Sequence, residues 1–157
     1  MQVGHDVHVD QSADSCRREL LEPAERWLPA PVSSSAAGDG RFLVWLGFGG
    51  PEISVTKEVA LTVGRPEVEE DRLVVPIGWR ATGPGQLFPV FDGQLTVRPL
   101  GPHSCRLSLS GGYEPPLGAL GRRLDEAMLH RAAEATLRHL AAGIAARVSE
   151  LAASRPA

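Results

Sequence analysis

The chain has 157 residues, of which 43% are hydrophobic and 22% are charged. These proportions are typical of a water-soluble globular domain, and a chain of this length buries roughly 70% of its unfolded surface, so disorder and collagen-like structure are excluded. The 16 basic and 19 acidic residues give a formal net charge of -3 without a block of either sign. This distribution argues against nucleic acid as a partner.

The cellular compartment is predicted from two kinds of segment that we do not find in the sequence, a membrane span and a signal peptide. No window reaches the ~18 consecutive apolar residues of a membrane span, and residues 1–10 lack the basic start and apolar core of a signal peptide. We therefore expect a cytoplasmic protein without an integral membrane segment. Cys16 and Cys105 are too far apart in the sequence for a zinc knuckle or a redox pair, so two reduced thiols are expected.

An alternating segment comes first in the chain. Residues 2–9 place one set of side chains on a single face, namely Val3, His5, Val7 and Val9. This period of two predicts a half-buried strand. Ser12 and Asp14 then offer N-cap oxygens for a helix that extends to Leu21.

A second short helix is predicted after a bend. Pro23 suits the first turn of a helix that carries Trp27. Residues 29–40 are rich in Pro, Ser, Ala and Gly and show no periodicity, which indicates a flexible loop. We expect a single domain over residues 1–157, with a frayed tail at 154–157.

Residues 41–113 are predicted to be extended almost throughout. Glycine and proline turns interrupt the segment at 49–51, 64–66, 83–85 and 99–102, which indicates an antiparallel meander. Parity assigns one apolar face, composed of Ile53, Val55, Val59, Leu61, Val63, Leu73, Val75, Ile77, Trp79, Phe91, Leu95, Val97, Leu107, Leu109 and Tyr113. Pro76, Pro89 and Gly93 interrupt these runs and predict an edge or bulges.

The period changes to about 3.6 after residues 115–116. An amphipathic helix is predicted over about 119–152, with an apolar stripe of Leu120, Leu124, Met128, Ala132, Ala135, Leu140, Ile144, Val148 and Leu151. Such a helix is roughly 50 Å long at 1.5 Å per residue, more than a small sheet covers, so we expect a break early in the helix or at Gly143.

The order of elements resembles a known superfamily. The specific segments are SVTKEVALTVG at 54–64, PIGWRATGPGQLFPVFDGQLTVRPLG at 76–101 and RLSLSGGYEPPLGALGRRLDEAMLHRAAEAT at 106–136. In these segments and in the order of its elements, the chain is similar to the SRPBCC, or START-like, superfamily. Within the superfamily it resembles a bacterial group with a GQLFP…DG strand and a YxPPLG…LH junction. The resemblance implies an α+β helix-grip fold, in which a curved antiparallel sheet wraps around a long C-terminal helix and two short helices follow the first strand.

The resemblance to this superfamily predicts the fold of the chain better than it predicts a ligand or a reaction. Its members include lipid carriers, hormone and flavonoid binders, polyketide cyclases and oxygenase subunits, and the resemblance implies a cavity between the sheet and the terminal helix. No catalytic motif of this group can be carried to a residue of this chain. We place Trp79, Phe91, Trp27 and Met128 nearest the cavity; the alternative is that they simply fill the core.

Two polar side chains are candidates for contacting a ligand. Lys57 falls by parity between Val55 and Val59 on the apolar face, where its amine is available to a ligand carboxylate or phenolate. A bulge or snorkelling to the rim is the alternative. Tyr113, the one tyrosine of the chain, ends an inward-facing run and offers a hydroxyl at the cavity mouth, unless it is a packed core residue.

Metal and nucleophile chemistry find little support in the sequence. His5 and His8 point to opposite faces of a strand, and His130 and His139 to opposite sides of a helix. His130 and Glu134 are spaced for a surface hydrogen bond. No Gly-x-Ser-x-Gly elbow or cofactor motif occurs in the sequence. We expect no metal, no cofactor and no catalytic residue.

Three functions remain open from the sequence. The favoured one is non-enzymatic binding or carriage of a small apolar or amphipathic molecule between the sheet and the terminal helix. The second is a cyclase- or dehydratase-like enzyme, in which positioning does most of the work. The third is an interaction module with a filled core that acts through its surface or as a homodimer.

Overall fold

The structure, a computed structural model, describes residues 2–29, 32–34, 40–49, 54–81, 90–114 and 126–155; within these, only the backbone is described at 32–34, 47–49, 54–57, 81 and 126–129. The strands are β1 (Gln2–Val9), β2 (Val32–Ser34), β3 (Arg41–Gly49), β4 (Ser54–Val63), β5 (Glu67–Glu69), β6 (Arg72–Ala81), β7 (Val90–Gly101) and β8 (Ser104–Glu114). The helices are α1 (Ala13–Leu20), α2 (Ala24–Trp27) and α4 (Glu126–Ser154).

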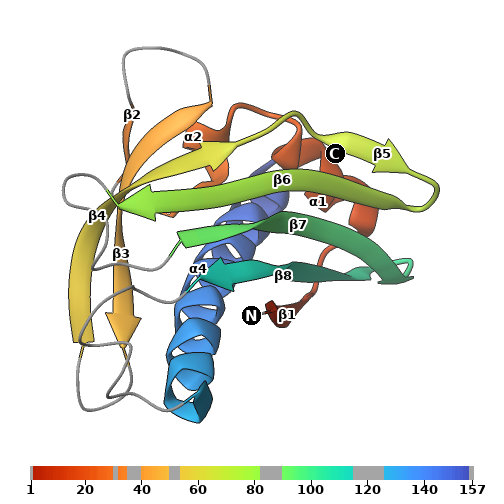
Figure 1. Cartoon of the computed structure of the whole chain (residues 1–157). Helices are drawn as coiled ribbons and strands as arrows, with labels where there is room; N and C mark the ends of the chain where they lie inside the picture. Colours follow the sequence, from red (N-terminus) through yellow and green to blue (C-terminus); the bar gives the residue numbers. More distant parts are fainter. Residues whose placement is uncertain are drawn as a thin grey trace.

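The strands form one curved antiparallel sheet. Their order is β1-β8-β7-β6-β4-β3-β2, and β5 pairs with β6 beside this path. The long helix α4 lies against one face of the sheet, and α1 and α2 lie beside the C-terminal end of α4 (Figure 1). This arrangement confirms the predicted helix-grip fold, because the apolar face of the sheet is buried against the long apolar helix of the chain.

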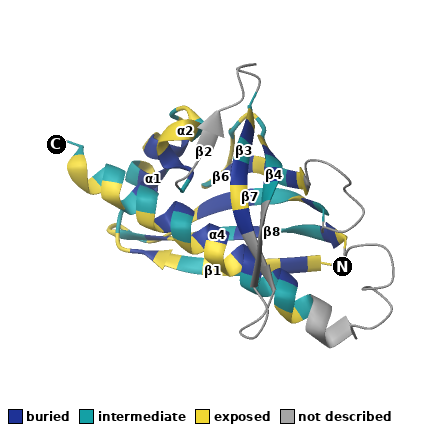
Figure 2. Ribbon diagram, turned by 90° about the vertical axis from the view of Figure 1, so that its left-hand side faces the viewer, coloured by how far each residue is buried: buried dark blue, intermediate teal, exposed yellow. Residues whose placement is uncertain are grey.

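The predicted alternation sets the faces of the sheet. Burial along β1 confirms the period of two, with Val3 and Val9 buried between exposed neighbours. On the face toward α4, which we call the inner face, the expected residues of β6, β7 and β8 are buried. The predicted Ile53 lies outside the described residues, and for Val55 only the backbone is described. Figure 2 shows buried positions collected where α4 meets the sheet.

The short helices begin where the sequence predicts them. The Ser12 hydroxyl caps α1 by accepting a hydrogen bond from the backbone N–H of Ser15 at 3.1 Å, and Asp14 lies in the first turn. Pro23 precedes α2. The loop expected at 29–40 needs one correction, because Val32–Ser34 pairs with β3 as strand β2. Residues 30–31 and 35–39 of that segment lie outside the described residues.

The terminal helix differs from the prediction in two respects. It continues through Gly143 without a break, whereas the other place expected for a break, early in the helix at 119–125, lies outside the described residues. A Cβ on Gly143 would lie 3.1 Å from Pro29 Cβ, so the missing side chain lets Pro29 approach. Its buried stripe agrees with the predicted one at Leu140, Ile144 and Val148 but differs from it in the preceding turns. Ala132 and Ala135 are only half-buried, whereas the buried side chains are Ala133, Thr136, Leu137, Leu140, Ala141, Ile144, Ala145 and Val148.

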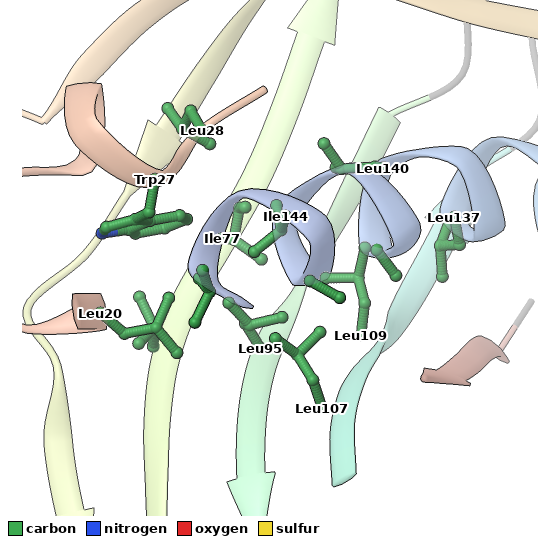
Figure 3. Packing of buried hydrophobic residues seen from close by; sticks show 14 of the residues in the cluster. Leu20, Trp27, Leu28, Ile77, Leu95, Leu107, Leu109, Leu137, Leu140 and Ile144 are labelled. Carbon is green, nitrogen blue, oxygen red and sulfur yellow. The ribbon is translucent and has the colours of Figure 1, made fainter. Parts of the chain in front are cut away.

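The core lies between α4, α1, α2 and the inner face. Leu20 and Trp27 come from the short helices, and Leu137 and Ile144 come from α4 (Figure 3). They belong to the same hydrophobic cluster as inner-face residues of β6, β7 and β8, which include Ile77, Leu95, Leu107 and Leu109. The described part of this interior is therefore closely packed with large aliphatic side chains.

Candidate ligand-binding site

Three of the predicted site residues lie in one row across the sheet. The register places Trp79 directly opposite Phe91, and Phe91 directly opposite Tyr113. Leu61 continues the row on β4 and Phe42 continues it on β3. Because residues directly opposite each other share a face, all five lie on the inner face, and we call them the aromatic row.

The aromatic row is part of the packed core. Trp79 and Phe91 are each 1% exposed, and their rings stack with centroids 4.5 Å apart. Tyr113 is 4% exposed, and its burial raises the pKa of the phenol well above the usual 10.0. The phenol is therefore neutral over the physiological pH range and is suited to hydrogen bonding rather than to charge pairing.

Trp27 lies apart from the row, at the end of α2. It is 1% exposed, and its indole Nε1–H donates to the backbone carbonyl of Glu22 at 3.2 Å. This hydrogen bond satisfies the polar edge of the ring, so the rest of the indole packs with the apolar core. Figure 3 shows the indole beside Leu20 and Leu28, at the end of α4 that carries Ile144.

The other two predicted residues are placed by their backbone alone. Lys57 lies on β4 directly opposite Leu46 of β3, which is buried. Met128 lies in the first turn of α4. The side chains of Lys57 and Met128 lie outside what the structure describes.

A groove of about 620 Å³ opens between the short helices and one end of β3 and β4. We call it the helix groove. Its apolar members include Leu20 and Trp27 from the helices and Phe42 and Val63 from the strands, and its charged members are Glu22, Glu25, Arg41 and Arg65. Phe42 is also the β3 end of the aromatic row. The groove therefore reaches the core at Phe42. The alternation of the strands does not predict this opening, because the groove also depends on the position of the short helices.

An ion pair fixes the wall of the helix groove. The guanidinium of Arg155, just after α4, donates from Nε to Glu19 Oε1 at 2.6 Å and from an Nη to Glu22 Oε1 at 3.3 Å. The hydrogen bonds to Glu19 and then to Glu22 raise the pKa of Arg155. Glu19 is 1% exposed, so this contact neutralises a buried carboxylate and holds the end of α1 against α4.

A second groove, of about 530 Å³, involves outward-facing residues of the sheet. It includes Thr62 of β4, Gly78 and Arg80 of β6 and Asp92 of β7. Trp79 and Phe91 also contribute to its lining. Its lining is about as polar as that of the helix groove, although the outward positions of these strands contribute charged and small residues.

The described residues contain no group of three His, Cys, Asp or Glu side chains arranged to hold a metal ion. The expected contact between His130 and Glu134 is confirmed at 2.8 Å, and both side chains are about half exposed. In the part of the chain that the structure describes, no helix is long and apolar enough to cross a membrane.

Comparison with known proteins gives matches at the level of structure. No family model matches the chain, and no curated protein matches it by sequence. A START superfamily protein from Mycobacterium smegmatis aligns over 96% of this chain and 98% of its own, with 20% identity and a TM-score of 0.54.

Two enzymes share the same fold. The Zhui aromatase/cyclase from Streptomyces sp. R1128 aligns over 99% of this chain and 94% of its own, with 18% identity and a TM-score of 0.55. Truncated norcoclaurine synthase from Thalictrum flavum aligns over 99% and 95%, with 14% identity and a TM-score of 0.58. The chain therefore has the START-like, or SRPBCC, fold.

Proposed function

We propose that this protein binds a small apolar or amphipathic molecule, and that the ligand enters through the helix groove. The observation that carries the proposal is the composition of the groove, in which Leu20, Trp27, Phe42 and Val63 are joined by four charged residues. Small-molecule sites are mostly apolar concave surfaces of about 300–1,000 Å³ with a few polar groups, and about 620 Å³ lies within that range.

The distribution of charge favours an amphipathic ligand. Glu22 is paired with Arg155, and Arg41 and Arg65 place positive charge on the strand side of the groove. A ligand that places an apolar body against Trp27 and Phe42 gains about 25 cal/mol per Å² of apolar surface removed from water. A polar or anionic head near the strand-side arginines keeps its solvation or gains a charge-assisted hydrogen bond.

We also propose that the site extends from the groove toward the inner face. Phe42 connects the groove to the aromatic row, where Trp79, Phe91 and Tyr113 follow. On β4, Val63 lies on the groove side of this row, and Lys57 lies on the side away from the groove. Lys57 is directly opposite the buried Leu46 of β3. An extension between the sheet and α4 brings Lys57 and Met128 into the proposed site as its remaining members.

The structural neighbours support a small-molecule ligand. An aromatase/cyclase and a norcoclaurine synthase use the same fold, and both names describe enzymes of small organic molecules. Binding is proposed for this chain rather than turnover, because the sequence offers no strong acid–base pair and the resemblance carries no catalytic motif to its residues. The carrier hypothesis requires nothing more than apolar burial and one polar contact.

The test compares two exposed apolar residues. Leu21 is 57% exposed and lines the helix groove, whereas Val68 is 61% exposed on β5 and lies outside the groove. We would titrate 1-anilinonaphthalene-8-sulfonate, an amphipathic anion, into the wild type, Leu21→Gln and Val68→Gln. Loss of an apolar contact worth about 1 kcal/mol should raise the Kd of the probe about fivefold in Leu21→Gln. The Val68→Gln variant should bind like the wild type.

Native mass spectrometry of the purified protein completes the test. A co-purifying apolar molecule, released by organic extraction and identified, would establish the ligand class directly. The proposal fails if the protein has a clean apo mass and takes up neither the probe nor fatty acids, sterols or aromatic polyketides. Equal weakening of probe binding by both variants would instead show that the probe does not occupy the helix groove.

A further inference from the structure

Cys16 and Cys105 lie next to each other in the fold although 89 positions separate them in the sequence. Their sulfur atoms are 3.3 Å apart, and both residues are 0% exposed. Sequence separation, from which we predicted no redox pair, does not limit contacts between a helix and a sheet, so the two thiols are neighbours in the fold. Both cysteines are free thiols in this structure.

The fold holds the two sulfurs in place from opposite layers. Cys16 lies on the buried side of α1, together with Ala13 and Leu20. Cys105 lies near the start of β8, directly opposite Val9 of β1 and Pro99 of β7. Helix α1 packs on β7 and β8, so the thiol pair marks the point where α1 contacts the sheet.

The two thiols differ in their surroundings. The hydrogen bond with Cys16 lowers the pKa of Cys105, and the nearby positive charge of Arg17 lowers it further, against the effect of burial. The same hydrogen bond and burial raise the pKa of Cys16. Of the two thiols, Cys105 is therefore the one that loses its proton more readily. The thiolate is the nucleophilic form of cysteine.

We propose that Cys16 and Cys105 form a reversible disulfide when the protein meets a peroxide, which makes the contact between α1 and β8 a redox-sensitive site. Cys105 loses its proton, the thiolate attacks one peroxide oxygen, the O–O bond breaks, and the leaving hydroxide takes up the proton that Cys105 lost to become water. The Cys16 sulfur then attacks the resulting sulfenic acid, the S–O bond breaks, and the Cys16 proton leaves with the hydroxide as a second water. Two thiols are oxidised and one peroxide is reduced.

The geometry requires only a local adjustment. A disulfide has an S–S distance of about 2.05 Å, so the sulfurs must approach by about 1.2 Å from their separation of 3.3 Å. Because both thiols are buried, peroxide reaches them when α1 opens from the sheet. The disulfide then ties α1 to β8 and restricts that opening. This inference does not depend on the proposed ligand.

The experiment follows the mass of the full-length protein. Reduced protein is treated with hydrogen peroxide, unfolded, alkylated at every remaining free thiol, and analysed intact and after non-reducing digestion. We expect loss of the mass of two hydrogen atoms, no alkylation and a peptide that links Cys16 to Cys105. Dithiothreitol should restore both thiols. The oxidised protein should unfold at a Tm roughly 5–15 °C higher, because the bond closes a long loop.

Single variants separate a pair from two independent thiols. In Cys16→Ala and in Cys105→Ala, peroxide should leave a sulfenic acid on the remaining cysteine that dimedone traps, because no second thiol is present to form the disulfide. The proposal is overturned if the treated wild type keeps two alkylatable thiols, forms disulfides between molecules, or gains oxygen on either sulfur without the linked peptide. The wild-type measurement decides the question even if a variant does not fold.

Discussion

Trp79 lies directly opposite Phe91 on neighbouring strands, and their rings stack with centroids 4.5 Å apart and planes 25° from parallel. Offset stacking of this kind contributes about 0.5–1.5 kcal/mol beyond the burial of the rings. Both residues come from the antiparallel pair β6 and β7, so the contact fixes the register of these strands at the middle of the aromatic row. The row is therefore a structural element of the sheet as well as part of the proposed site.

The first prediction concerns Trp79 and uses Trp45 as its control. Trp79 is 1% exposed, whereas Trp45 lies on β3 with 51% exposure. Replacing a buried Trp with Ala removes its packing and leaves a cavity, so Trp79→Ala should lower the free energy of unfolding by about 3–5 kcal/mol. Trp45→Ala should lower it by less than about 1 kcal/mol. Urea unfolding followed by far-UV circular dichroism measures both values without relying on tryptophan fluorescence.

Similar losses in the two variants would contradict the burial of Trp79. A changed slope of the unfolding free energy against urea concentration, rather than a changed midpoint, would show that Trp79→Ala alters the compactness of the folded or the unfolded state. Any ligand-binding measurement on Trp79→Ala needs this stability correction first, because a partly unfolded population lowers apparent affinity without a direct contact.

The second prediction concerns a position on β7 that has no room for a side chain. A Cβ on Gly93 would collide with the backbone carbonyl oxygen of Ser110 and would lie 2.6 Å from Phe91 Cζ. The Phe91 ring is itself held by Trp79, so it cannot move away freely. Gly93→Ala should therefore lower the free energy of unfolding by about 1–3 kcal/mol.

Gly101 provides the matched control on the same strand. A Cβ there would meet Ser104 Oγ at 3.7 Å, which is an ordinary contact. Gly101→Ala should change the unfolding free energy by no more than about 0.5 kcal/mol. If thermal and urea unfolding show the two alanine variants to be equally stable, then the close approach of β7 and β8 at Gly93 does not constrain the fold.

Much of the fold can be predicted from the sequence because its signals are local. The alternation of Leu73, Val75, Ile77 and Trp79 predicts the buried face of β6 correctly, and Ser12 predicts the start of α1. Each signal depends on near neighbours in the chain, which share one backbone conformation. The order of these elements then restricts the architecture to a sheet packed on the terminal helix.

The features that escape prediction all depend on how elements meet. The predicted stripe of α4 is wrong only before Leu140, where Ala133 and Leu137, rather than Ala135, are buried; at about 100° per residue, Ala135 lies about 140° around the helix from Leu140. The Cys16 and Cys105 pair arises where α1 packs on β8, and the helix groove arises between the short helices and the ends of β3 and β4. Single-element periodicity contains no information about such contacts. The aromatic row needed the cross-strand register as well.

The third prediction uses Tyr113, the one tyrosine of the chain, as a spectroscopic probe. Burial raises the pKa of its phenol above the usual 10.0, so the folded protein retains the proton where the unfolded chain releases it. The unfolded state then binds fewer protons, and stability falls as pH rises above about 10. The wild type should lose up to about 1.4 kcal/mol per pH unit more than Tyr113→Phe. Ultraviolet absorbance of the phenolate provides the direct measurement: its appearance near pH 10 in protein that circular dichroism shows to be folded would refute the burial of Tyr113.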